Sequence, residues 1–171
     1  PPPPSPPTQS CQTYDGDKLV QKCGFLFFDL HNITGQDGSS LLTSARIEHG
    51  YEYFVQFDGS GVPKQLPNCT VDSDTSNLGV QMRLDGGGCR TLGLINLMAF
   101  SAHPESSRLL VAATGGDSGR AVLIKAQCTP GAHYATLTET YEEGIVYNFN
   151  LVLPDKHCSL SPPTNTTTTT T

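Results

Sequence analysis

Short apolar runs, several with an apolar side chain at every second position, are the feature that most constrains the fold of this chain. They occupy residues 24–30, 51–57, 79–84, 92–100, 108–113, 120–127 and 145–153. Turn-forming dipeptides lie between them, at Asp15-Gly16, Asp37-Gly38, Asp58-Gly59, Asp85-Gly86 and Gly115-Gly116. Period-two alternation indicates strands, and Asp-Gly favours tight turns. The pattern predicts an all-β fold, an antiparallel β-sandwich or flattened barrel, with a short helix at residues 91–98 as a local alternative.

The two ends of the chain differ in composition from the middle. Proline fills positions 1–4, 6 and 7, and threonine fills positions 166–171. Proline tracts favour extended polyproline II over helix or central sheet, and neither end carries apolar side chains that could be buried. We therefore divide the chain into a Pro-rich extended segment at residues 1–10, a β domain at residues 11–158 and a Pro/Thr-rich tail at residues 159–171.

Cysteines and glycosylation sequons point to an oxidising, secretory environment. All the cysteines fall inside the predicted domain, at Cys11, Cys23, Cys69, Cys89, Cys128 and Cys158. An even number beside such flanks is typical of disulfides, and no pair has the close spacing of zinc ligands, so we expect no metal and no cofactor. Sequons at Asn32, Asn68 and Asn165 predict N-glycans on exposed loops. We expect a secreted protein of the cell surface or matrix.

Charge and motif content exclude several function classes. The chain has 10 Lys and Arg against 16 Asp and Glu, with a net charge of −6. The basic residues are not clustered, so we expect no nucleic-acid partner, and no apolar run is long enough to span a bilayer. No Gly-x-Ser-x-Gly elbow occurs. The Gly-Gly-Asp-Ser-Gly sequence at residues 115–119 is better interpreted as a turn, and we expect no enzymatic activity.

Three segments in the second half of the chain form a recognisable set. A Gly-Gly-Gly-Cys hairpin ends at Cys89, a strand from Arg120 ends at Cys128, and a closing Glu…Tyr…Cys segment spans residues 139–158. This set resembles the mannose 6-phosphate receptor homology family. The resemblance implies a mannose-type glycan site made of Gln81, Arg120, Glu139 and Tyr147, with Glu142 and Glu143 as alternatives for the carboxylate. An amide, a forked cation and a carboxylate suit sugar hydroxyls, and tyrosine adds a flat apolar wall.

The same resemblance implies a disulfide between Cys128 and Cys158. The family usually has a cysteine just before the closing tyrosine, where this chain has Ile145 and Val146. Cys89 must then pair elsewhere, and the four remaining cysteines allow three connectivities. Proximity in sequence favours Cys11–Cys23 and Cys69–Cys89.

The flanking tracts resemble hydroxyproline-rich glycoproteins of plant and algal extracellular matrix and, in composition, mucins. This resemblance implies O-linked sugars on the two tracts, at Pro2, Pro3, Pro4, Pro6, Pro7, Thr166, Thr167, Thr168, Thr169, Thr170 and Thr171. The primary expectation is a heavily glycosylated structural glycoprotein that repeats along a filament or matrix. Its partners would be copies of itself, with the tail of one copy along a sheet edge of the next, head to tail. The alternative is a mannose-type lectin domain on glycosylated stalks.

Overall fold

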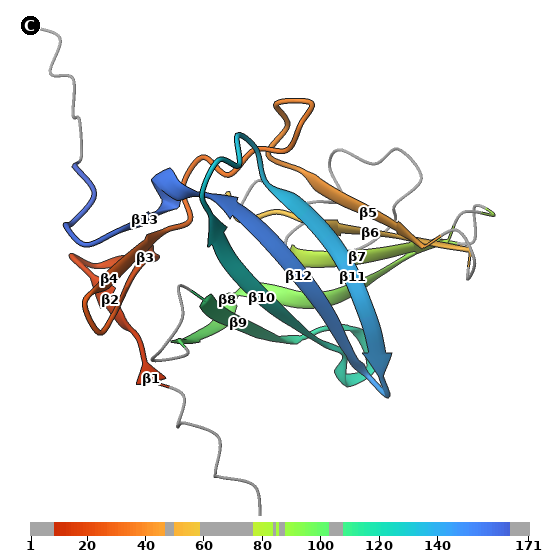
Figure 1. Cartoon of the computed structure of the whole chain (residues 1–171). Helices are drawn as coiled ribbons and strands as arrows, with labels where there is room; N and C mark the ends of the chain where they lie inside the picture. The colour runs from red at the N-terminus through yellow and green to blue at the C-terminus, as the bar shows by residue number, and fades with distance from the viewer. Residues whose placement is uncertain are drawn as a thin grey trace, which may run out of the picture.

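The computed structural model describes residues 9–46, 50–58, 77–83, 85, 88–102 and 108–164, leaving aside the side chains of 45, 46 and 139–142. The described chain is 64% strand and 5% helix. Figure 1 shows a large curved sheet that nearly closes into a barrel, with a small second sheet at one side. The predicted all-β class is therefore confirmed.

The large sheet holds the strands that the apolar runs predict. Its order is β11-β12-β10-β9-β8-β7-β6-β5, and β1 pairs with β8 off this path. The strands are β1 (Gln9–Ser10), β5 (Leu42–Arg46), β6 (Tyr51–Val55), β7 (Asn77–Arg83), β8 (Cys89–Ala102), β9 (Arg108–Gly115), β10 (Ala121–Thr129), β11 (Thr136–Glu143) and β12 (Val146–Pro154). Residues 91–98 lie within β8, so the helical alternative is wrong.

One pairing in this sheet is parallel. β10 and β12 run in the same direction from Ala121↔Val146 to Thr129↔Pro154, while β11 pairs antiparallel with β12 on its other side. The chain leaves β10, passes to β11 and returns through a hairpin, so β12 fills the position between them. The sheet is otherwise antiparallel.

The small sheet joins the two ends of the described chain. Its order is β13-β4-β3-β2, formed by β2 (Gln12–Tyr14), β3 (Asp17–Cys23), β4 (Leu26–Asp29) and β13 (Cys158–Ser159). The run at residues 24–30 is a strand only from Leu26, because Gly24 adopts a φ of 65° in the turn after β3. In Figure 1 both β1 and β13 lie on the side of the molecule that carries this sheet.

Disulfides hold this arrangement together. Cys11–Cys23 and Cys128–Cys158 are both formed, as predicted, with Cα–Cα distances of 4.4 and 6.2 Å. Cys89 is also disulfide-bonded, and Cys69, its predicted partner, lies outside the described residues. The second bridge ties the end of β10 to β13, so it links the large sheet to the small one.

The core lies inside the curved large sheet. Tyr53, Phe149, Leu92 and Leu109 are at most 1% exposed and belong to one apolar cluster that also reaches Phe28 of the small sheet. Full burial of such side chains contributes roughly 1.5–3 kcal/mol each. Two single-turn 3₁₀ helices complete the description, η3 (Asp117–Gly119) before β10 and η4 (Asp155–His157) before β13.

Candidate functional site

Three of the predicted sugar-site residues converge inside the large sheet. Gln81 lies on β7, Arg120 directly precedes β10, and Tyr147 lies on β12. The Gln81 Nε2 donates to the Tyr53 hydroxyl at 3.2 Å, and the Arg120 Nε donates to the Tyr147 hydroxyl at 3.2 Å. The Tyr53 and Tyr147 rings lie 6.2 Å apart between centroids. Tyr53 is thus the link between the two pairs, and sequence reasoning did not single it out.

This cluster is closed in the structure. Tyr53 is 0% exposed, and Gln81 and Tyr147 are each 5% exposed. A second guanidinium nitrogen of Arg120, Nη1, donates to the Asp117 carbonyl at 2.8 Å. The cavity that Gln81 lines with Arg83 and Arg90 has a volume of only about 50 Å³ and is not lined by Tyr53, Arg120 or Tyr147. A sugar would therefore enter only if the cluster rearranged.

For the predicted carboxylate, Glu139 or its alternative Glu142, the structure gives only the backbone pairing. β11 pairs Glu139 with Phe149 and Glu142 with Tyr147, with an irregularity between Glu139 and Tyr141. The side chains of Glu139 and Glu142 lie outside the description. The register nevertheless sets Glu142, which the sequence analysis gives as an alternative to Glu139, directly opposite Tyr147.

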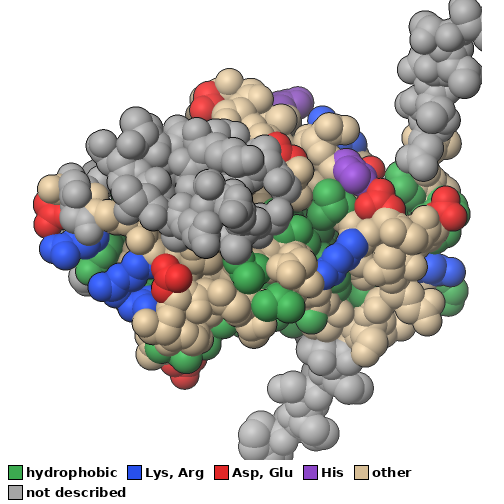
Figure 2. Space-filling model, turned by 180° about the vertical axis from the view of Figure 1, so that it is seen from behind, with side chains coloured by type: hydrophobic (Ala, Val, Ile, Leu, Met, Phe, Trp, Pro, Cys, Tyr) green, Lys and Arg blue, Asp and Glu red, His purple; other side chains and the backbone are tan. Residues whose placement is uncertain are grey.

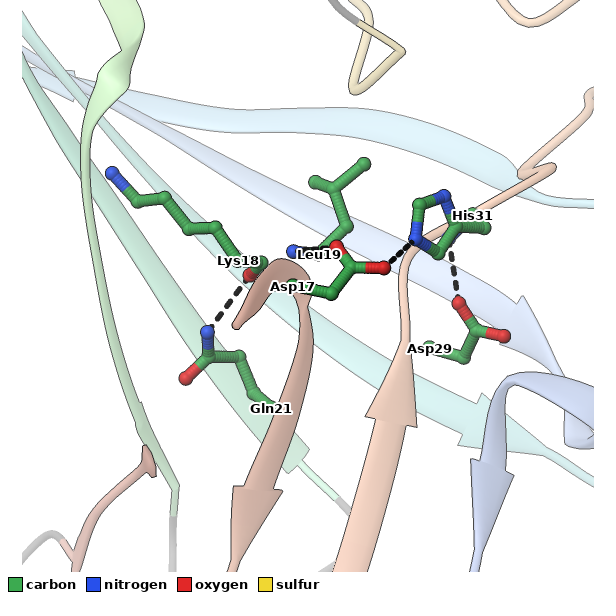
Figure 3. Close-up of polar contacts among 6 residues, drawn as sticks. All are labelled: Asp17, Lys18, Leu19, Gln21, Asp29 and His31. Carbon is green, nitrogen blue, oxygen red and sulfur yellow. Dashed lines mark hydrogen bonds and ion pairs between the residues drawn. The ribbon is translucent and has the colours of Figure 1, made fainter. Parts of the chain in front are cut away.

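A second polar cluster lies where β3 begins and β4 ends (Figure 3). The Asp17 carboxylate accepts the backbone N–H of Leu19 at 3.0 Å and pairs through its other oxygen with the His31 Nε2 at 2.5 Å. The backbone N–H of His31 donates to Asp29 Oδ1 at 2.9 Å. The two paired side chains, of His31 and Asp17, are 42% and 40% exposed. The pair joins two segments that are distant in sequence, which is why no local motif pointed to it.

A cavity of about 360 Å³ adjoins this cluster. Leu30 and Phe57 form apolar lining and are 1% and 4% exposed, while His31, Asn32, Ser40 and Asp58 supply polar lining. The Ser40 hydroxyl donates to Asp58 Oδ2 at 2.9 Å, and His31 uses its Nε2 for Asp17. Ser40, His31 and Asp58 therefore share a cavity without forming the Ser–His–Asp relay that acyl transfer requires.

One buried histidine contacts the second cluster through the backbone of Asp29. His157 in η4 is 4% exposed, and its Nδ1 donates to the Asp29 backbone carbonyl at 2.7 Å. Burial lowers the pKa of His157 below its usual 6.5, because desolvation disfavours the charged imidazolium. The Asp29 carbonyl and carboxylate oppose this shift, and neighbouring Lys156 adds to it. The side chain is therefore a neutral structural contact between η4 and β4.

The predicted modification sites are only partly within the described chain. Asn32 is exposed in the loop after β4. Asn68, Asn165 and both O-glycosylation tracts, Pro2 to Pro7 and Thr166 to Thr171, lie outside the described residues. Within the described ranges, no group of three or more His, Cys, Asp or Glu residues is arranged to hold a metal ion. The described chain also contains no helix with the length and apolarity needed to cross a membrane.

Charged side chains of the described residues do not gather into a patch of one sign on one face of the molecule (Figure 2). On the face drawn in Figure 2, acidic and basic side chains of the described residues are interspersed, with apolar side chains in separate small groups.

Comparison of the sequence with protein-family models and with curated proteins finds no match. Functional inference therefore rests on the sequence patterns and the geometry.

Proposed function

We propose that this chain is a disulfide-stabilised structural glycoprotein of the extracellular space that repeats along a filament or matrix. The observation that carries the proposal is how the two ends of the domain are anchored. On the N-terminal side, Gln9 and Ser10 pair with β8, and the next residue, Cys11, is bonded to Cys23. On the C-terminal side, β13 pairs with β4, and Cys158 is bonded to Cys128.

This anchoring suits a domain that transmits tension. A pull on either terminal tract reaches a strand pair and a disulfide within a few residues. The Cys11–Cys23 bond passes the load to β3, and the Cys128–Cys158 bond passes it to the end of β10. The two bonds take residues 12–22 and 129–157 out of the covalent line of force, and the described residues between Cys23 and Cys128 are held by strand pairing. A lone binding domain on flexible stalks has no need of this reinforcement.

We assign a neighbouring copy to the seam between the two edges of the large sheet. Its two edges, β5 and β11, are not joined by a ladder, and Leu42, Thr43, Tyr134 and Thr136 line a cavity of about 460 Å³ at this seam. Open edges promote pairing with another chain, and threonine has a high strand propensity. The Thr-rich tail of a second copy is the segment we propose for this seam, in a head-to-tail contact that propagates.

Removal of the tail tests this proposal. The full chain and a variant lacking residues 161–171 would be secreted from a eukaryotic host and compared by light scattering after size-exclusion chromatography. We expect concentration-dependent polymers of the full chain and a folded, disulfide-bonded monomer of the variant. A full chain that stays monomeric at every concentration would refute self-assembly.

A mannose-type lectin is the second candidate, favoured by the convergence of Gln81, Tyr53, Tyr147 and Arg120. The register of β11 makes Glu142 the carboxylate we would add to this site. Calorimetric titration with methyl α-mannoside tests it on the parent chain and on Arg120→Met. The control is Arg108→Met, since Arg108 is exposed and bonds Gln127 at 3.1 Å. Binding that only Arg120→Met abolishes would favour the lectin, and no binding by the parent chain would exclude it.

A further inference from the structure

The sequon at Asn32 lines the cavity beside the Asp17–His31 pair. Asn32 is exposed, adopts a left-handed φ of 56°, and lines the cavity together with Thr34 of the same sequon. Transfer of a glycan forms a bond between Asn32 Nδ2 and C1 of the first sugar. The lipid diphosphate of the oligosaccharide donor leaves, and the amide gives up one proton. That first sugar is N-acetylglucosamine, so it begins at the edge of the cavity.

The lining of the cavity matches the chemistry of this sugar. Leu19 is partly exposed and presents apolar surface suited to the C–H face of a pyranose and to an N-acetyl methyl group, with the buried Leu30 and Phe57 behind it. Ser40 and Asp58 present a hydroxyl and a carboxylate to sugar hydroxyls. The volume, about 360 Å³, lies near the lower end of the roughly 300–1,000 Å³ that small-molecule sites span.

A buried amide behind the polar wall is incompletely satisfied. Gln56 is 0% exposed, and its Nε2 donates to Ser40 Oγ at 3.0 Å and to Asp58 Oδ2 at 3.3 Å. Its Oε1 has no hydrogen-bond partner among the described residues. A buried acceptor without a partner is unfavourable. The Nε2 of Gln56 nevertheless holds Ser40 Oγ and Asp58 Oδ2, the polar groups of the cavity wall, in place from behind.

We infer that the first N-acetylglucosamine of a glycan on Asn32 is seated in this cavity and forms part of the fold. The inference rests on the proposed extracellular glycoprotein. The seated sugar packs on Leu19 and bridges the loop after β4 to the segment after β6. It therefore stabilises the domain, whereas a glycan that points into solvent would leave stability unchanged.

Thermal unfolding of differently glycosylated forms tests whether the first sugar on Asn32 occupies the cavity, an arrangement called the seat below. The full chain is secreted with high-mannose glycans, and one portion is trimmed to a single N-acetylglucosamine with endoglycosidase H. We expect equal Tm for the intact and trimmed forms. Asn32→Gln and Thr34→Ala, which both abolish the sequon, should lower Tm by about 2–4 °C, the order expected for a modest loss in a chain of this size. Thr34→Ser, which keeps the sequon, should retain the glycan and the Tm.

Asn165→Gln is the matched control, since it removes the predicted tail glycan and should leave Tm unchanged. A second measurement does not depend on a variant that folds. Peptide N-glycosidase F should release the Asn32 glycan more slowly from the native protein than the Asn165 glycan, and equally fast after denaturation. A glycan on Asn32 that leaves Tm unchanged when removed and is released at the same rate as that on Asn165 would overturn the seat alone. Absence of glycan from both sequons in secreted protein would overturn both the seat and the glycoprotein assignment.

Discussion

Tyr53 illustrates which residue-level features the sequence carries and which it does not. From the sequence, only a family resemblance places Gln81, Arg120 and Tyr147 in one site. In the structure these three of the four candidate residues lie in one cluster, linked through Tyr53. Tyr53 was predictable as a strand residue, but its hydrogen bond to Gln81 depends on β6 lying beside β7. The choice between Glu139 and Glu142 depends on an irregularity in one ladder. No periodic pattern in a single sequence encodes either feature.

His157 makes stability depend on pH. Its pKa is lowered in the folded state, so the unfolded chain binds more protons below pH 6.5. The contribution of the neutral, buried imidazole is fully present above pH 6.5 and is lost as the pH falls below that value. We expect the free energy of unfolding to decrease between pH 7.5 and pH 5, and His157→Gln to weaken this decrease. Urea unfolding at several pH values measures it.

The exposed His133 provides the control for this experiment. His133→Gln should reproduce the pH dependence of the parent chain. If His157→Gln leaves the pH dependence unchanged as well, burial of His157 is not its cause.

Gly116 is required by close backbone approach. A Cβ added there would lie 2.5 Å from the Leu92 carbonyl oxygen and 2.6 Å from that of Arg120. Both neighbours are backbone atoms and cannot move aside. We expect Gly116→Ala to destabilise the domain by roughly 1–3 kcal/mol, the usual cost of overpacking, as measured by urea unfolding. Gly131→Ala measures the cost of a left-handed backbone without a steric contact, because nothing lies within 4 Å of an added Cβ there. A Gly116→Ala variant as stable as the parent chain would contradict the steric argument.

At the scale of elements, the clear alternation at residues 51–57, 108–113 and 145–153 correctly predicts β6, β9 and β12. β11 was missed because its sequence is largely polar, with Leu137 as its buried apolar side chain. β3 was missed because Lys18 and Lys22 interrupt its apolar positions. The parallel pairing of β10 with β12 is a property of topology, and the alternation along either strand is compatible with both directions.

The two described disulfides should differ in what they contribute. Cys128–Cys158 spans 30 residues and Cys11–Cys23 spans 12. In the chain-entropy model a loop of about 30 residues stabilises by roughly 3–4 kcal/mol, somewhat more than a shorter loop. We expect the double variant Cys128→Ala with Cys158→Ala to lose more stability in urea than Cys11→Ala with Cys23→Ala. The opposite order would show that the shorter bridge supports native packing that loop entropy does not describe.

At the scale of the whole molecule, the arrangement combines a nearly closed sheet with a small sheet that gathers both ends of the domain. The sequence predicted the β domain between Pro- and Thr-rich tracts, but it could not show that β2, β3, β4 and β13 share one sheet. The place of β13 in that sheet depends on contacts between residues more than 120 positions apart, such as Cys158 with Phe28. The arrangement is also the basis for the proposed role in tension, because both attachment points are covalently reinforced.

Electron microscopy of the native, secreted protein tests the structural role most directly. We expect filaments or a lattice in which β domains of this shape repeat, with density for glycans on the tracts between them and the tail of one copy at the β5–β11 seam of the next. Isolated, monomeric domains without a repeating contact would contradict the account.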